Sequence, residues 1–170
     1  MSFTSTSVSV VAAILIAAYS IGQFTSKSIA TEIEIAAPAS AIWAELANTA
    51  DYADWNPFLK YLSGDLRVGS TLAVTIQSIG NSTMDFTPTV LVSDEAQELR
   101  WIGHLGFKGI FDGEHSFVLE ETPMGTTIFR QNETFSGMLA FILFALIGND
   151  TESGFKAMNE ALKARVEEKA

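Results

Sequence analysis

The sequence predicts a single α+β domain in which a strongly curved antiparallel sheet of about six strands wraps around a long C-terminal helix. Three features lead to this prediction. Residues 29–36 alternate apolar and charged side chains, which is the period of a half-buried strand. Five further segments between residues 71 and 135 alternate in the same way, whereas apolar residues near the C-terminus recur at helical spacing. A sheet that bends around one helix encloses an apolar cavity unless large side chains fill its centre.

Two short helices are predicted after the first strand. Pro38 suits the first turn of a helix, where its missing N–H costs nothing. The polar residues Asn48, Thr49 and Asp51 can end this helix and begin a second one. Pro57 ends the second helix, because the residue before a proline avoids helical backbone angles.

Five strands are predicted to follow the short helices. Residues 80–82 and 122–125 carry turn signals between consecutive strands. Pro88 lies inside the third strand of the sheet, which implies an edge position or a bulge. The five predicted strands cover residues 71–77, 84–92, 98–104, 110–121 and 126–135.

The C-terminal part begins with the apolar segment MLAFILFALI, residues 138–147. Asn149 and Asp150 can cap a last helix after it. Ten apolar residues are too few to cross a bilayer. The segment is therefore either the first half of the helix that packs over the sheet, or an apolar lid over a pocket mouth. Such a lid could contact a bilayer or a partner protein.

Composition and charge exclude several classes of function. Hydrophobic residues make up 48% of the chain and charged residues 18%, which indicates a large core, an apolar cavity or both. A net charge of −10 argues against nucleic-acid binding, which needs a basic surface. The absence of cysteine excludes disulfides, thiolate zinc sites and cysteine nucleophiles. With two histidines and neither a metal-binding motif nor a glycine-rich phosphate loop, we predict no metal and no cofactor.

The N-terminal part, residues 1–28, consists of a hydrophobic segment and a polar linker. Residues 8–24 carry no charge, and their length of 17 reaches the lower limit for crossing a bilayer core. We therefore predict a single N-terminal membrane span that holds the folded domain, residues 29–170, near a membrane. The small residues at 28–30 also permit a cleaved signal peptide and a secreted protein. A buried segment of the domain is the third alternative.

Several short motifs accompany this order of elements. They are WNPF at 55–58, RWIG at 100–103, HSF at 115–117, FSG at 135–137 and GFKAMNEALKARVEE at 154–168. With these motifs, the chain resembles the SRPBCC superfamily, the START-like group that includes polyketide cyclases and dehydrases. The resemblance covers residues 29–168 and implies a helix-grip fold with a tunnel between the sheet and the C-terminal helix. Members bind lipids, sterols, polyketides, plant hormones or quinones, and some catalyse cyclisation or dehydration.

The candidate ligand pocket is a set of large apolar side chains together with the polar groups that share their faces. By periodicity alone, these side chains could equally fill the core. The resemblance to a ligand-binding family favours a pocket. The set is Trp55, Phe58, Phe86, Trp101, His115, Phe117, Phe129, Gln131, Glu133, Phe135, Phe141, Phe155 and Met158.

Three polar members of this set could act on a ligand. His115 lies on an otherwise apolar strand face, and its titration range suits acid–base chemistry; alternatively it is a core histidine bonded to the backbone. Glu133 could act as a base or orient His115, or it could be solvated at a strand end. Counting outward from the turn at 122–125 places these two a few residues out of register. Gln131 could anchor a ligand hydroxyl or carbonyl, and His104 is expected at the surface.

The predicted function is the binding or carriage of a hydrophobic small molecule or lipid in an internal cavity close to a membrane. The alternative is a polyketide cyclase/dehydratase-like enzyme that uses His115, with Glu133, as acid and base. A third hypothesis is an interaction protein whose residues 138–147 dock a partner.

Overall fold

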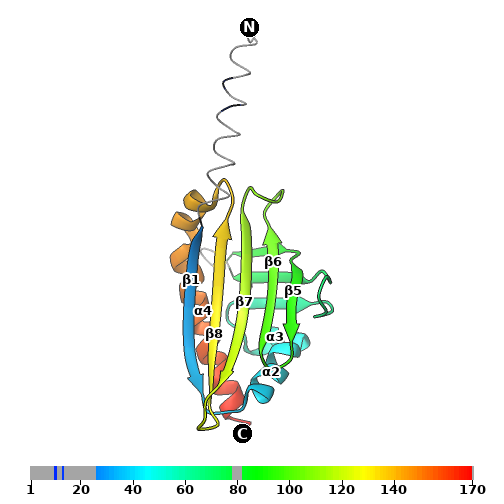
Figure 1. Cartoon of the computed structure of the whole chain (residues 1–170), viewed down its shortest axis with the longest axis vertical. Helices are drawn as coiled ribbons and strands as arrows, with labels where there is room; N and C mark the ends of the chain where they lie inside the picture. Colours follow the sequence, from blue (N-terminus) through cyan, green and yellow to red (C-terminus); the bar gives the residue numbers. More distant parts are fainter. Residues whose placement is uncertain (1–9, 11–12, 14–25, 78–81, 170) are drawn as a thin grey trace.

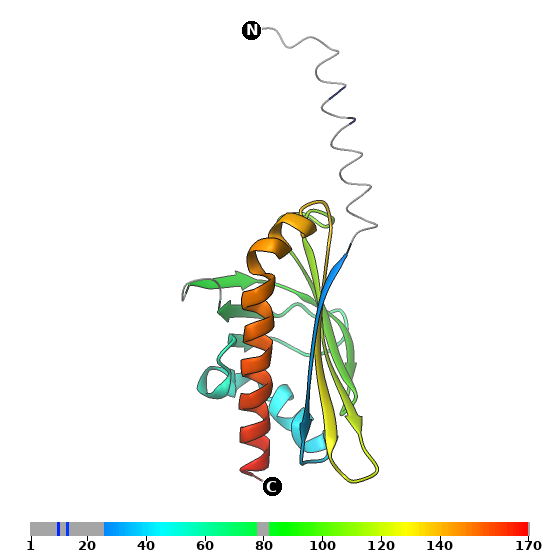
Figure 2. The same ribbon diagram turned by 90° about the vertical axis from the view of Figure 1, so that its left-hand side faces the viewer.

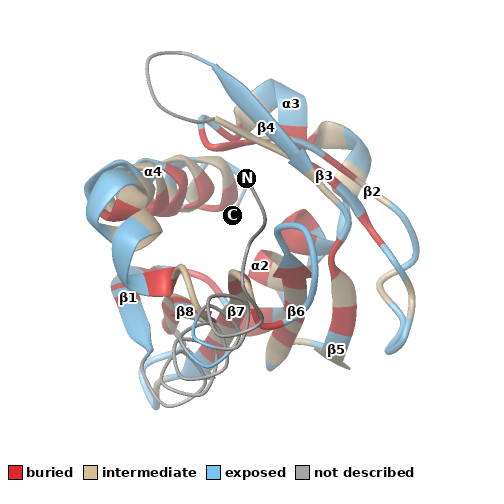
Figure 3. Cartoon of the chain, turned by 90° about the horizontal axis from the view of Figure 1, so that it is seen from above, coloured by how far each residue is buried: buried red, intermediate tan, exposed pale blue. Residues whose placement is uncertain are grey.

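A computed structural model describes residues 26–77 and 82–169, together with Val10 and Ala13. This part of the chain forms two antiparallel sheets and a long C-terminal helix (Figure 1). The predicted α+β class and the grip of antiparallel sheets on the terminal helix are confirmed. Viewed along the long axis, the two sheets and the helix surround a common interior (Figure 3).

The larger sheet has five strands in the spatial order β1-β8-β7-β6-β5. Burial alternates along β6, β7 and β8, so one face of the sheet is buried, as the alternating sequence pattern predicts. The strands are β1 (Lys27–Ile35), β5 (Thr89–Asp94), β6 (Glu98–His104), β7 (Asp112–Glu121) and β8 (Thr127–Ser136).

The smaller sheet consists of β2 (Leu59–Ser63), β3 (Ala73–Gln77) and β4 (Thr83–Phe86). A backbone bridge between Thr71 and Thr89 connects it to the larger sheet. The prediction of about six strands in one sheet is therefore wrong in two respects. The short strand β2 was missed, because five residues without regular alternation carry little signal. The predicted strand at 84–92 is two strands, because Pro88 has no N–H for the ladder and the chain changes sheets there.

The predicted short helices are α2 (Ala39–Ala47), the single 3₁₀ turn η1 (Thr49–Asp51) and α3 (Tyr52–Trp55). The side chain of Asn56 ends α3, since its Oδ1 accepts hydrogen bonds from the backbone N–H groups of Phe58 and Leu59 at 2.9 and 2.8 Å. This bend directs Phe58 and Leu59 toward the interior.

The C-terminal helix α4 runs without interruption from Ala140 to Glu167 (Figure 2). The expected cap at Asn149 and Asp150 is wrong, because both residues lie exposed inside the helix. Segment 138–147 therefore supplies the first turns of α4. Farther along, α4 packs against β1 and β8 through Phe155, Met158, Leu162 and Val166.

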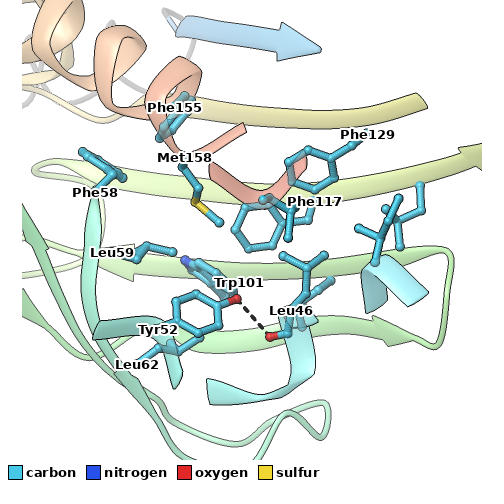
Figure 4. Packing of buried hydrophobic residues seen from close by; sticks show 14 of the residues in the cluster. Leu46, Tyr52, Phe58, Leu59, Leu62, Trp101, Phe117, Phe129, Phe155 and Met158 are labelled. Atoms are coloured by element: carbon cyan, nitrogen blue, oxygen red, sulfur yellow. Dashed lines mark hydrogen bonds between the residues drawn. The ribbon is translucent and has the colours of Figure 1, made fainter. Parts of the chain in front are cut away.

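The centre of the molecule is filled rather than hollow. Phe117, Phe129 and Met158 are completely buried and meet between the sheet and α4 (Figure 4). Gln131 is also completely buried, and its Nε2 donates to the sulfur of Met158 at 3.2 Å. Any space for a ligand must therefore lie toward one end of α4.

Among the described residues, no helix is both long and apolar enough to cross a bilayer. The predicted membrane span at 8–24 lies outside the described residues, apart from Val10 and Ala13. The span therefore stays a prediction.

An ion-pair network connects α2 with the end of α4. Arg165 and Lys169 both donate to the carboxylate of Glu45, and Arg165 also donates to Asp51 at 2.8 Å. Burial alone would raise the pKa of Glu45, but the hydrogen bonds from Lys169 and Arg165 outweigh it and hold the pKa below its usual value.

This lowered pKa makes part of the stability dependent on pH. The contribution is complete above the ordinary glutamate pKa of about 4.3 and is lost as the pH falls through the lower folded-state pKa. Glu45→Gln is expected to lower the free energy of unfolding by about 1 kcal/mol at pH 7. Urea denaturation at pH 7 and pH 3 measures the free energy of unfolding of both proteins. The difference between wild type and Glu45→Gln should be smaller at pH 3 than at pH 7. An equal difference at both pH values would show that Glu45 stabilises the fold through packing.

Candidate functional site

A cavity of about 180 Å³ lies between the two sheets and the first half of α4. It lies at the end of the molecule where α4 begins. Its polar wall residues are Gln77, Asp85, His104, His115, Glu133, Asp150 and Thr151, with Gly103 and Gly113 between them. Its apolar wall residues are Phe58, Leu59, Ile76, Met84, Phe86, Trp101, Leu105, Phe111, Phe135, Leu143, Ile147 and Phe155.

Seven of the predicted pocket residues line this cavity. They are Phe58, Phe86, Trp101, His115, Glu133, Phe135 and Phe155. The other six do not: Phe117, Phe129, Gln131 and Met158 belong to the filled centre, Trp55 packs beside Tyr52, and Phe141 is 68% exposed on α4.

The sheet register brings the polar and aromatic wall residues together. Trp101 on β6, His115 on β7 and Glu133 on β8 lie directly opposite one another across the three strands. The neighbouring row contains Gly103 and Gly113 at the corresponding positions of β6 and β7. These two residues occupy inward positions without a side chain, which leaves space beside the aromatic row.

Gly113 gives the Glu133 side chain the space it occupies beside His115. A Cβ atom at this position would lie only 2.5 Å from Oε1 of Glu133, which is closer than any ordinary contact. The absence of a side chain therefore lets the Glu133 carboxylate reach His115.

His115 and Glu133 form a buried pair. Nδ1 of His115 lies 2.8 Å from Oε2 of Glu133, and the two side chains are 6% and 12% exposed. The predicted offset of a few residues was wrong: Glu121 pairs with Thr127 across the connection at 122–126, and counting back from this pair places His115 directly opposite Glu133. The alternative of a solvated Glu133 is likewise wrong.

Aromatic rings hold the imidazole of His115 on several sides. Trp101 stacks on it with ring centroids 4.9 Å apart and an interplanar angle of 14°. The rings of Phe117 and Phe155 meet it edge-on at 4.7 and 5.1 Å. These contacts fix the orientation of the imidazole plane.

The pairing determines which nitrogen of His115 is free. A carboxylate only accepts hydrogen bonds, so we assign the proton of the neutral imidazole to Nδ1. Nε2 then carries a lone pair, and this atom is buried without a hydrogen-bond partner in the described structure. A buried acceptor without a partner is costly. A ligand hydroxyl that donated to Nε2 would remove this cost.

A second histidine–carboxylate pair lies at the rim of the cavity. Nδ1 of His104 is 2.7 Å from Oδ1 of Asp112, whose carboxylate also accepts from the backbone N–H of Gly109. The His104 side chain is 33% exposed, which agrees with its expected place near the surface, but it also lines the cavity. Within the described residues, no group of three or more histidine, aspartate and glutamate side chains is arranged to hold a metal ion.

Several residues of the cavity wall were not among the predicted pocket residues. Leu143 and Ile147 line the cavity from one face of α4, and their spacing of four residues was the available signal. Leu59 comes from the missed strand β2. Gly103 and Gly113 leave no periodic signal of their own.

Comparison with known proteins agrees with this architecture. The family model described as polyketide cyclase/dehydrase and lipid transport matches residues 26–167. Norcoclaurine synthase from Thalictrum flavum, in complex with dopamine and hydroxybenzaldehyde, is similar with a TM-score of 0.65 and 18% identity over 87% of this chain and 91% of that one. No curated protein matches the chain in sequence.

Two further solved structures show the same likeness. The Zhui aromatase/cyclase from Streptomyces sp. R1128 has a TM-score of 0.66 and 16% identity over 84% of this chain and 94% of its own. A START superfamily protein from Mycobacterium smegmatis has a TM-score of 0.63 and 18% identity over 84% and 99%. At these identities the likeness establishes the fold alone.

Proposed function

The chain belongs to the SRPBCC family of polyketide cyclases, dehydrases and lipid-transport proteins, and on that premise we propose that it binds a small apolar molecule carrying a hydroxyl group. Two observations on His115 carry this proposal: the residue lines an apolar cavity within an aromatic frame, and its Nε2 is buried without a hydrogen-bond partner in the described structure. The apolar wall supplies affinity through burial, and Nε2 supplies an acceptor that orients the ligand.

The cavity volume limits the size of the ligand. A cavity of about 150 Å³ can hold one benzene ring, whereas drug-sized ligands occupy about 300 Å³ or more. The cavity of about 180 Å³ therefore fits one substituted ring, or the end of a longer molecule that extends out of the cavity.

The molecules bound in one similar structure support this choice of ligand. Dopamine and hydroxybenzaldehyde, present with norcoclaurine synthase, are both hydroxylated rings. The predicted segment at 8–24 adds the proposal that the domain works beside a membrane, where apolar molecules partition.

The proposal is tested by calorimetric titration of the full chain with 4-ethylphenol and with ethylbenzene. These compounds share an apolar body and differ in one hydroxyl. We expect the phenol to bind about tenfold more tightly, since one additional hydrogen bond contributes about 1.4 kcal/mol. Equal affinities would exclude Nε2 as the anchor, and an absence of binding by both would contradict the proposed function.

Two variants on α4 test whether these compounds bind in the cavity. Leu143→Trp places a large ring in the cavity wall and is expected to abolish binding of both compounds. Leu146→Trp is the matched control, because Leu146 is 64% exposed on the same helix and does not line the cavity.

Acid–base catalysis is the second candidate, and the His115–Glu133 pair is the observation that favours it. A carboxylate bonded to Nδ1 holds the imidazole in the tautomer whose Nε2 can accept a proton, as general-base catalysis requires. In this case Nε2 would accept a proton from the substrate, and Glu133 would stabilise the resulting imidazolium. Mass spectrometry of the recovered ligand separates the two functions: a carrier releases its ligand unchanged, whereas an enzyme releases a product of different mass.

A further inference from the structure

Exposed apolar side chains gather at one end of the molecule. Leu105 and Phe107 come from the β6–β7 loop and are 52% and 81% exposed. Phe141, Ile142 and Leu146 come from the first turns of α4 and are 68%, 59% and 64% exposed. We call these five residues the apolar tip. Contiguous apolar surface of this kind marks an interaction site in a folded protein.

The two parts of the apolar tip are held together by the backbone. The N–H of Met138 donates to the carbonyl of Gly109 at 2.9 Å, and the N–H of Leu139 donates to Ile110 at 2.8 Å. Gly137 permits this approach, because a Cβ atom there would lie 2.8 Å from the Ile110 carbonyl oxygen. The loop and the helix start therefore form one defined surface.

The cavity adjoins the apolar tip. Leu105 belongs to the tip and also lines the cavity. Leu143 and Ile147 line the cavity from the same two turns of α4 that carry Ile142 and Leu146 on the outside. A molecule entering the cavity here would pass the tip.

The chain enters the domain at this same end. Lys27, the first residue of β1, lies opposite Phe135, and its ammonium group is 5.3 Å from the centre of the Phe141 ring. Figures 1 and 2 both place the start of β1, the β6–β7 loop and the start of α4 at one end of the molecule. The uncharged run at 8–24 precedes Lys27 by only two residues, and 17 residues span about 26 Å as a helix, close to a bilayer core of about 30 Å.

Charge distinguishes the apolar tip from the rest of the protein. Residues 105–111 and 137–149 contain one charged side chain, Lys108, and the adjoining Lys27 adds a second positive charge. The other eight lysines and arginines are outnumbered by twenty acidic residues elsewhere in the chain. Lysines at the edge of an apolar surface can extend their ammonium groups to lipid phosphates while their stems stay in apolar contact.

We propose that the apolar tip docks onto the surface of a lipid bilayer, with Phe107 and Phe141 inserted below the headgroups. Docking in this orientation turns the mouth of the cavity toward the acyl chains, so that an apolar ligand passes between membrane and cavity without crossing water. This ligand route rests on the proposed function, whereas the docking itself does not.

The test uses fluorescent labels at single cysteines in the full chain, which has no cysteine of its own. Phe107→Cys and Phe141→Cys report on the tip. Met124→Cys is the matched control, because Met124 is 82% exposed in the β7–β8 turn at the opposite end (Figure 2). Each labelled protein is reconstituted with phosphatidylcholine vesicles in which part of the lipid carries a spin-label quencher in its acyl chains.

We expect labels at positions 107 and 141 to lose at least about half of their emission to the lipid quencher, and the label at 124 to lose none, since interfacial side chains lie about 5–10 Å deep. Vesicle-bound protein with three unquenched labels would overturn the proposal, as would protein that does not bind vesicles. The labels could also quench one another in vesicles that contain no lipid quencher. This result would show that a second copy of the chain covers the apolar tip, and it would also overturn the docking proposal. Titration with 4-ethylphenol in detergent solution tests ligand binding separately, so that failure of docking and failure of the proposed function can be told apart.

Discussion

Replacing His115 with leucine is expected to lower the free energy of unfolding by about 3 kcal/mol. His115 is the hydrogen-bond partner that the structure gives to the Glu133 carboxylate, and the Glu133 side chain is only 12% exposed. The variant therefore leaves a buried charge without its partner. Chemical denaturation at pH 7 measures the loss. Binding of 4-ethylphenol by this variant should fall to the level of ethylbenzene.

A double variant separates stability from function at this pair. His115→Leu combined with Glu133→Leu removes both polar partners and should recover most of the lost stability, because replacing both members of a buried hydrogen-bonded pair by apolar residues costs little. It should not recover the preference for the phenol. A double variant that kept this preference would show that neither residue recognises the hydroxyl.

The second pair provides the control for this experiment. His104→Leu removes a histidine that is 33% exposed, and the Asp112 carboxylate, which is 8% exposed, keeps its hydrogen bonds from the Gly109 N–H. A loss of at most about 1 kcal/mol is expected, because this carboxylate is not left without a donor. An equal loss in His104→Leu and His115→Leu would show that the missing partner of Glu133 is not the cause.

Replacing Gly154 with alanine is expected to lower the free energy of unfolding by about 1–3 kcal/mol through overpacking. Helix propensity alone predicts the opposite sign, since alanine is about 1 kcal/mol better than glycine inside a helix. Packing outweighs propensity because a Cβ atom at Gly154 would lie 2.2 Å from Cδ2 of Phe58. Phe58 lines the cavity and meets Phe155 edge-on at 5.4 Å, so its displacement should also weaken ligand binding.

Gly148 is the matched control in the same helix. A Cβ atom there would meet the ring of Phe144 at 3.2–3.3 Å, and this partly buried ring can adjust. Gly148→Ala should therefore be neutral or stabilising by up to about 1 kcal/mol. Thermal or urea denaturation of both variants tests the contrast. A stabilised Gly154→Ala would contradict the close approach of α4 to Phe58.

Much of the fold was predictable because its sequence signal is local. Alternation along β1, β7 and β8 identified the buried face of each strand, and helical spacing from Phe155 to Val166 identified the buried face of α4. The division of the chain into two sheets was not predictable in this way. It depends on Pro88 and on a pairing between Thr71 and Thr89, which are distant in sequence.

The candidate site was predicted in its residues but not in its geometry. His115 and Glu133 were correctly placed on inward faces, but their direct pairing depends on the register that the pair Glu121 and Thr127 sets across the connection at 122–126. Periodicity shows which face of a strand is buried and not how completely that face is filled. For this reason Phe117 and Phe129 were assigned to the pocket although they pack the centre, and Gly103 and Gly113, whose missing side chains open the cavity, were overlooked.

The central claim is that the cavity beside His115 holds the apolar body of a ligand whose hydroxyl bonds to Nε2. A crystal structure of the protein with 4-bromophenol tests it most directly, because the anomalous signal of bromine locates the ring without ambiguity. The account predicts a bromine peak inside the cavity and the phenol oxygen about 2.8 Å from Nε2. A cavity closed by its own side chains, or a ring bound with its oxygen directed away from His115, would contradict it.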